Sequence, residues 1–203
     1  MSEKKRPLIL GLGGTPRAGS SAERALAVSL AAAAAQGADT EMIAGPDLLL
    51  PMYNPNSPER TDGARRLVDL FRRCDGLVIA SPTYHGSVSG LIKNALDYVE
   101  DLRNDARPYL SGRAVGCIAN AAGWQGAVTT LGALRDIVHA LRGWPTPLGV
   151  CIGGTEPAFA PDGRCIDARV DEQLRTLGRE VFEFAHRMRA HQACNPSAVR
   201  AAA

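Results

Sequence analysis

One stretch of the chain concentrates groups that can hold a flat polar molecule. The segment 81–97 follows the apolar run 76–80 and leads into a helical pattern, which predicts a buried strand, a tight polar loop and a helix. The loop offers an aromatic ring at Tyr84, an imidazole at His85, hydroxyl groups and the backbone N–H groups beside Gly86. Open α/β sheets bind ligands in loops at the carboxyl ends of their strands. These residues therefore favour a hydrogen-bonding cofactor such as a flavin ring.

A second set of such groups follows the first predicted strand, in the turn-rich segment 13–21. The helix expected after it offers unpaired N–H groups and a partial positive charge, which attract a phosphate. Thr15 and Ser20 add hydroxyl groups, and Arg17 adds a positive charge. The dinucleotide fingerprint G-x-G-x-x-G is not completed, because Pro16 stands in place of its third glycine. The segment therefore favours a single phosphate monoester over a pyrophosphate.

Both segments also have an ordinary structural interpretation. Ser20 and Glu23 have the spacing of a capping box, and the carboxylate of Glu23 would repel a phosphate. Pro82 can tighten a strand–helix turn against which Tyr84 packs. The imidazole of His85 can act as an acid or base, but hydride chemistry belongs to a cofactor. A positioning role for His85 therefore competes with a catalytic one, and no residue is assigned as a certain catalytic group.

The elements that position these groups follow from the hydrophobic pattern. Short unbroken apolar runs predict strands, and apolar residues at helical spacing predict helices. Strands are expected at 8–13, 40–44, 77–80, 114–119 and 148–152, and helices at 22–36, 59–73, up to 103, at 127–141 and at 167–189. A rigid turn is expected at 143–147. This alternation is typical of one doubly wound α/β domain with a parallel sheet, placed here at 1–191 before a flexible tail at 192–203.

Composition excludes several classes of protein. The 203 residues suffice for one domain with a full core, and 45% hydrophobic and 22% charged residues are typical of a soluble globular chain. A net charge of +2 without a dense Lys/Arg stripe argues against nucleic acid. The longest apolar run, within 25–35, is far shorter than the ~20 residues that cross a membrane. No membrane association and no targeting segment are expected.

Five cysteines are scattered along the chain, and none forms a C-x-x-C pair. This usage is typical of buried thiols in a reducing, cytoplasmic setting. No group of His, Cys, Asp and Glu residues has the spacing of metal ligands, so no metal is expected.

The central stretch also carries a family resemblance. Its pattern S-P-x-Y-x-G-S-x-x-G-x-x-K-N-A-L-D resembles the central motif of the NADPH-dependent FMN reductases. That resemblance implies a flavodoxin-like fold with a five-stranded parallel sheet in the order 2-1-3-4-5 and helices on both faces. It also implies FMN as cofactor, NADPH or NADH as hydride donor, and a homodimer or homotetramer.

The resemblance extends to the segment 14–20, which is similar to the family's phosphate loop G-S/T-x-R-x-x-S. In the flavodoxin-like order this loop, the central loop and the loop 120–126 face one crevice. The resemblance implies cofactor contacts at Thr15, Arg17, Ser20, Ser21, Ala22, Glu23, Pro82, Thr83, Tyr84, His85, Gly86, Ser87, Asn120, Ala121, Gly123 and Trp124.

The favoured hypothesis is an FMN-dependent oxidoreductase in which a reduced nicotinamide gives a hydride to flavin N5 and a small-molecule substrate then takes the electrons. An alternative is an FMN-dependent dehydrogenase of a dedicated biosynthetic intermediate, an amino-deoxychorismate-type cyclohexadiene. Arg103, Arg107 and Arg113 would then serve a carboxylated substrate. A non-enzymatic electron carrier is disfavoured by the net charge of +2, since such carriers tend to be acidic. A scaffold that has lost its cofactor is disfavoured by the intact central motif.

Overall fold

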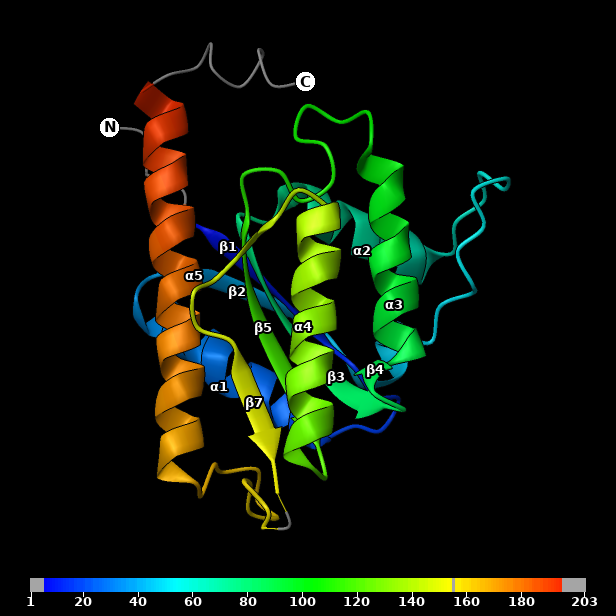
Figure 1. The fold of residues 1–203 in the computed structure, drawn as a ribbon. Helices are drawn as coiled ribbons and strands as arrows, with labels where there is room; N and C mark the ends of the chain where they lie inside the picture. Colours follow the sequence, from blue (N-terminus) through cyan, green and yellow to red (C-terminus); the bar gives the residue numbers. More distant parts are fainter. Residues whose placement is uncertain (1–5, 155, 195–203) are drawn as a thin grey trace.

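The computed structural model describes residues 6–154 and 156–194. A twisted sheet stands between two layers of helices (Figure 1). The strands are β1 (Leu8–Gly13), β2 (Asp39–Ile43), β3 (Gly76–Tyr84), β4 (Ser87–Val88), β5 (Ala114–Ala121), β6 (Trp144–Pro145) and β7 (Val150–Gly153). The α-helices are α1 (Ser21–Ala35), α2 (Asp62–Arg73), α3 (Gly90–Asp97), α4 (Trp124–Ala140) and α5 (Ala168–Cys194), with 3-10 turns η1 (Gly45–Leu48) and η2 (Tyr98–Leu102).

The order of the strands confirms the expected flavodoxin-like topology. The sheet runs β2-β1-β3-β5-β6, and every pairing along this path is parallel. β7 pairs with β5 as well, beside residues 118–121, whereas β6 pairs beside Ala114 and Val115. The two short strands therefore share the fifth position. With β4, which pairs with β3, the described sheet has seven strands rather than the expected five.

Proline explains why the fifth position is split. The predicted turn at 143–147 contains β6, so that expectation was wrong for Trp144 and Pro145. Pro145 and Pro147 have no backbone N–H, and a parallel ladder cannot continue through them. The chain leaves β5 after β6 and returns to it at Val150.

The strands appear in the sequence as unbroken apolar runs because both faces of the sheet are covered. Along β3, Leu77 and Ile79 belong to the core beneath α2, α3 and α4, while Val78 and Ala80 belong to the core beneath α1 and α5. Alternate residues thus serve opposite cores, and the carboxyl ends of the strands stay at one edge, where loops are free to bind a ligand.

The central motif differs most from its prediction. Instead of a loop from Ser81 onward, β3 continues to Tyr84 and pairs antiparallel with β4. His85 and Gly86 form the two-residue turn of this hairpin, with φ angles of 51° and 82°. Two positive φ angles give a turn whose twist matches that of the strands. The central motif is therefore a short hairpin followed by α3.

Several helix ends also differ from expectation. α4 begins at Trp124 rather than at 127, and the helix expected up to 103 becomes a 3-10 turn after Asp97. α2 begins at Asp62 rather than at 59, because Thr61 Oγ1 accepts the backbone N–H of Ala64 at 3.3 Å and caps the helix there. α5 continues to Cys194, into the tail expected from 192. Residues 195–203 of that predicted tail lie outside the described residues.

The cysteines are free thiols, and the expected burial holds for Cys74 and Cys117, whereas Cys151 and Cys165 are partly buried and Cys194 is exposed. Burial raises the pKa of Cys74 to about 11 and that of Cys117 to about 12, so both stay protonated at neutral pH. Among the described residues, no helix is long and apolar enough to cross a membrane. The same residues contain no group of His, Cys, Asp and Glu that could hold a metal.

Arg113 holds together the edge at which the strands begin. Its side chain is fully buried and donates to the carbonyl oxygens of Arg72 and Cys74, at 3.0 and 3.1 Å, and of Tyr109 and Ser111, at 3.1 and 3.3 Å. Arg72 and Cys74 end α2, so the guanidinium caps that helix. Burial lowers the pKa of Arg113, but these four acceptors compensate for the lost hydration of the charge.

Two of the three arginines expected to serve a substrate have a structural role instead. Arg107 Nη2 donates to Cys74 O at 2.6 Å, next to Arg113. Arg103 forms an ion pair with Glu100 at 3.6 Å. Arg107 and Arg113 lie at the amino ends of β3 and β5, opposite the predicted ligand-binding edge, so the hypothesis that they bind a carboxylated substrate is wrong.

We predict that Arg113→Met lowers the free energy of unfolding by about 3 kcal/mol, because four buried carbonyl groups lose their donor. Urea unfolding followed by circular dichroism measures this change. The matched variant Arg103→Gln removes an exposed ion pair and should cost less than about 1 kcal/mol. Equal losses in the two variants would contradict the capping role of Arg113.

Candidate cofactor site

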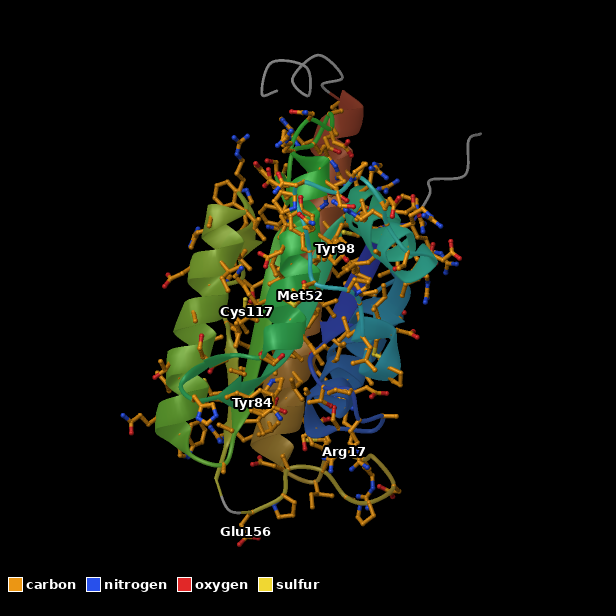
Figure 2. All side chains as sticks on the ribbon, turned by 90° about the vertical axis from the view of Figure 1, so that its right-hand side faces the viewer. Arg17, Met52, Tyr84, Tyr98, Cys117 and Glu156 are labelled. Atoms are coloured by element: carbon orange, nitrogen blue, oxygen red, sulfur yellow. The ribbon has the colours of Figure 1, made fainter. Side chains whose placement is uncertain are left out.

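The structure brings the three predicted loops to one edge of the sheet. Residues at the carboxyl ends of neighbouring strands are direct partners, namely Gly13 with Ala80, Pro82 with Asn120, and Ala121 with Gly153. Arg17, Tyr84 and Glu156 all lie towards this end of the molecule (Figure 2). The crevice at this edge is therefore built from the loops after β1, β5 and β7 and from the central hairpin.

The first loop has the features of an anion site. Ser20 is the N-cap of α1, and its buried Oγ accepts the backbone N–H of Glu23 at 3.3 Å. The exposed Ser21 and the buried Ala22 begin the helix, where backbone N–H groups lack helical acceptors. Thr15 Oγ1 donates to Arg17 O at 3.1 Å and shapes the loop.

The charges of the first loop are arranged more favourably for binding an anion than the sequence indicated. Glu23 Oε2 accepts the N–H of Gly19 at 2.9 Å, one residue before the partner that a capping box requires. The carboxylate is thus held against the backbone of its own loop. Arg17 is exposed, and among the described residues it makes no ion pair. Its guanidinium is available to an anion.

Gly14 permits the first loop to lie against the central hairpin. A Cβ atom at Gly14 would stand 2.6 Å from Pro82 Cδ, 2.8 Å from Ile92 Cγ1 and 2.9 Å from Ala80 O. All three distances are shorter than a real Cβ contact. The two loops can meet this closely only because residue 14 has no side chain.

Ser89 forms the polar half of the same junction. Its Oγ donates to Gly14 O at 3.1 Å and accepts Ile92 N–H at 3.3 Å, while its own N–H donates to Ser81 Oγ at 3.0 Å. One buried serine therefore caps α3 and ties the first loop to the hairpin. Gly14 and Ser89 were not assigned to the site from the sequence, although a serine directly before a helical pattern is a recognisable N-cap signal.

The tip of the hairpin is presented to solvent. Pro82 is buried, and Thr83 Oγ1 donates to Gly126 O at 3.2 Å, which fixes the hairpin against α4. Tyr84 is 53% exposed, which argues against the alternative interpretation that it packs locally. His85, Gly86 and Ser87 are exposed as well. This gives one edge of the crevice an aromatic ring, an imidazole and a hydroxyl group.

The third loop contains an unsatisfied buried acceptor. Asn120 and Ala121 end β5, Gly123 is the N-cap of α4, and Trp124 is the first residue of that helix. Asn120 Oδ1 is buried and has no hydrogen-bond partner among residues 6–154 and 156–194. Leaving such an atom unpaired costs about 1–3 kcal/mol, so each case calls for an explanation. A donor on a bound ligand provides one.

A cavity of about 320 Å³ opens beside Asn120. Its walls are Ser21, Asn120, Ala121, Ala122, Ile152, Gly153, Gly154, Glu156, Pro157, Ala158 and Phe159. The loop after β7 forms one whole wall, although the sequence gave no reason to place it there. Both α1 and β5 contribute predicted site residues, so the cavity adjoins the first and third loops.

A larger cavity, of about 730 Å³, lies elsewhere. It lies between the segment 53–60 and η2 and contacts none of the predicted site residues. Its wall is well ordered, since Arg60 Nε and Nη2 each donate to the Asp101 carboxylate at 2.8 Å and the guanidinium stacks 5.0 Å from the Tyr53 ring centroid.

A flavodoxin-like sheet with polar loops gathered at its carboxyl edge defines the class of protein: an α/β domain of the flavoprotein type. Comparison with known proteins identifies the family. The profile described as NADPH-dependent FMN reductase matches residues 7–156, and the chain belongs to this family.

Individual proteins agree with that assignment. An FMN-dependent NADPH-azoreductase of Staphylococcus aureus (strain USA300) is 31% identical over 134 residues, 65% of this chain and 68% of that enzyme. An NADPH azoreductase of Bacillus sp. (strain OY1-2) is 28% identical over 106 residues, so the match spans 52% of this chain but only 56% of that enzyme. Among solved structures, RosB with bound 8-demethyl-8-formylriboflavin-5'-phosphate superposes with a TM-score of 0.74 at 17% identity, covering 95% of this chain and 86% of RosB.

We predict that Gly14→Ala weakens FMN binding at least tenfold and lowers the free energy of unfolding by about 2 kcal/mol, because the added methyl group separates the first loop from the hairpin. Titration with FMN, followed by quenching of flavin fluorescence, measures the affinity, and urea unfolding measures the stability.

Gly132→Ala is the matched control. Gly132 lies within α4, and a Cβ atom there would meet nothing within 4 Å. Alanine should stabilise this helix by about 0.5–1 kcal/mol and leave FMN binding unchanged. Unaltered FMN affinity in Gly14→Ala would refute the role assigned to the junction.

Proposed function

We propose that this chain is an FMN-dependent oxidoreductase that takes a hydride from NADPH or NADH and delivers the electrons to a small-molecule acceptor. Membership of the FMN reductase family supports the cofactor and the donor. The observation that carries the proposal for this chain is the buried, unpaired Oδ1 of Asn120 at the edge where three polar loops meet. The imide and hydroxyl groups of FMN are donors of the kind that this oxygen lacks.

The donor groups of the first loop fit the phosphate of FMN. The first turn of α1 would supply backbone N–H groups, Ser20 and Thr15 hydroxyl groups, and Arg17 a positive charge. The Glu23 carboxylate is bonded to Gly19 N–H, which limits its repulsion of a phosphate. We assign phosphate binding to this loop.

The ring of FMN fits the opposite side of the crevice. Pro82, Thr83 and the turn after Tyr84 would line one side of it, and Asn120 to Trp124 the other. Tyr84 and Trp124 are exposed at the carboxyl edge, whereas the strands beneath them are buried. This combination suits a ligand with one apolar face and a polar rim.

FMN, when bound, supplies the ring that accepts a hydride and passes electrons on. The protein's own residues bind and orient the partners of that exchange. His85 stands exposed on a strained, left-handed backbone turn at the crevice, and we assign it a positioning role towards the substrates. The rigid hairpin, fixed by Thr83 to α4, keeps that turn in place.

Other hypotheses receive less support. The hypothesis of a dehydrogenase for a carboxylated cyclohexadiene required three arginines at the substrate. Two of them, Arg107 and Arg113, cap α2 instead. A non-enzymatic carrier remains disfavoured by the net charge of +2. The expected homodimer or homotetramer and the cytoplasmic location are carried by the family resemblance and by cysteine usage, and both stay proposals.

The decisive experiment is an absorption spectrum of the FMN-loaded protein during anaerobic addition of NADPH or NADH. A flavin spectrum that bleaches within seconds supports the proposal. A flavin spectrum that stays oxidised points to a dehydrogenase with its own substrate, or to a carrier. Failure to bind added FMN would overturn the proposal.

We predict that Arg17→Gln weakens FMN binding about tenfold while leaving riboflavin binding within twofold, because only FMN carries the phosphate that the guanidinium contacts. Paired fluorescence titrations with the two flavins measure this difference. Arg164→Gln is the control, since it removes the same charge from an arginine already paired with Asp162. An equal loss for both flavins would place the phosphate elsewhere.

A further inference from the structure

Beside the candidate cofactor site, Arg169 is a cation for which the described part of the chain supplies no acceptor. It lies in the first turn of α5, and its guanidinium carbon is 5.3 Å from the centroid of the Trp124 ring. Within the described residues, no carboxylate or carbonyl group accepts from its side chain. The nearby Asp167 instead accepts the backbone N–H groups of Arg169 and Val170, at 2.9 and 3.0 Å. The charge of Arg169 is therefore held in place but not neutralised.

Other arginines in this part of the chain are paired. Arg164 faces Asp162 at 3.8 Å, and Arg175 faces Asp171 at 2.7 Å on the same helix. A neighbouring carboxylate thus offsets the charge of each of these two arginines. Arg169 differs because its contact is an aromatic ring, which leaves all its in-plane N–H donors free.

The Trp124–Arg169 pair adjoins the 320 Å³ cavity from two sides. Trp124 follows the cavity-lining loop 120–123, and its Cα lies 3.4 Å from where a Cβ atom on Gly153 would stand. On the other side, Ile166 N donates to O of the cavity-lining Ala158 at 2.8 Å, three residues before Arg169. The pair is thus fixed by both walls of the cavity.

Exposed apolar side chains lie on or next to the two helices that carry this pair. Trp124 is 45% exposed, and Val128, one turn later on the same face of α4, is 60% exposed. Ile166, just before α5, is 49% exposed. A cation beside apolar side chains is complementary in charge and polarity to a flat aromatic molecule that carries one negative group.

We propose that Trp124 and Arg169 form the acceptor subsite of this enzyme and select planar aromatic substrates that bear a carboxylate or a sulfonate. The apolar side chains contact the aromatic system, and the guanidinium donates two parallel hydrogen bonds to the anionic group. Arg169 lies beyond residues 7–156, so the match to the family profile covers Trp124 but not this half of the subsite. The proposal names the substrate class of the function proposed above and rests on it.

The test compares two acceptors that differ by one charge, 1,2-naphthoquinone-4-sulfonate and 1,2-naphthoquinone. With FMN-loaded enzyme, NADPH supplies the hydride and solvent the proton that convert either quinone to its hydroquinone. Arg169→Gln should raise KM for the sulfonated quinone about tenfold and change KM for the neutral quinone less than twofold. Arg175→Gln removes an equal charge from the same helix and should change neither.

Two outcomes would overturn the subsite. If Arg169→Gln changed KM equally for both quinones, Arg169 would have no role in recognising the anionic group. A rise in KM for NADPH but not for NADH, with both quinones unaffected, would assign Arg169 to the 2′-phosphate of the donor instead.

Direct binding keeps this test separate from the test of function. The chain has two tryptophans, so in a Trp144→Phe background Trp124 is the only one. Naphthalene-2-sulfonate should quench its fluorescence, with a Kd about tenfold higher after Arg169→Gln, whether or not NADPH reduces the protein. If the protein binds the sulfonate but does not oxidise NADPH, the proposed function is rejected and the subsite is retained. If it oxidises NADPH but shows no preference for the charged acceptor, the subsite is rejected and the proposed function is retained.

Discussion

The contact between Gly14 and the hairpin is the constraint on which the site depends. The first loop would supply the phosphate-binding groups and the hairpin the ring-binding groups, and the two come from strands separated by more than sixty residues of sequence. They meet because Gly14 has no side chain to hold Pro82 and Ile92 away, and because Ser89 bonds the Gly14 carbonyl. A cofactor that spans both loops binds more tightly when the distance between the first loop and the hairpin is already fixed.

Stability is concentrated at the opposite edge. Arg113 caps α2, and the nearly buried Asp75 accepts Leu8 N–H and Arg189 Nη1 at 2.9 and 2.7 Å, which links β1, β3 and α5. The charges of Arg113 and Asp75 are enclosed by their partners. At the carboxyl edge, Arg17, Arg169 and Asn120 Oδ1 have no acceptor or donor among the described residues. Unused polar capacity of this kind, gathered where three polar loops meet, supports placing the ligand at this edge.

For the central hairpin, the local sequence predicted the chemical groups of the site correctly but their backbone conformation wrongly. Ser81 to Ser87 contain the polar groups expected of a ligand loop, but most of them extend β3 and form β4. The extension is possible because β5 continues beside β3 as far as the pairing of Pro82 with Asn120. The hairpin turn then places His85 and Gly86 outward on a rigid support rather than on a mobile loop.

The sequence by itself predicted the alternation of strands and helices, a parallel sheet and the three loops, because burial on both faces leaves unbroken apolar runs and each helix carries its own periodicity. The order of the strands was implied only by the family resemblance of the central motif. The sequence also identified Ser20 as an N-cap, since capping is decided within four residues. Tertiary structure alone decided that Arg113 is structural, that Arg169 stacks on Trp124 and that Gly14 touches Pro82. Those contacts join residues far apart in the chain, and only packing determines which of them meet.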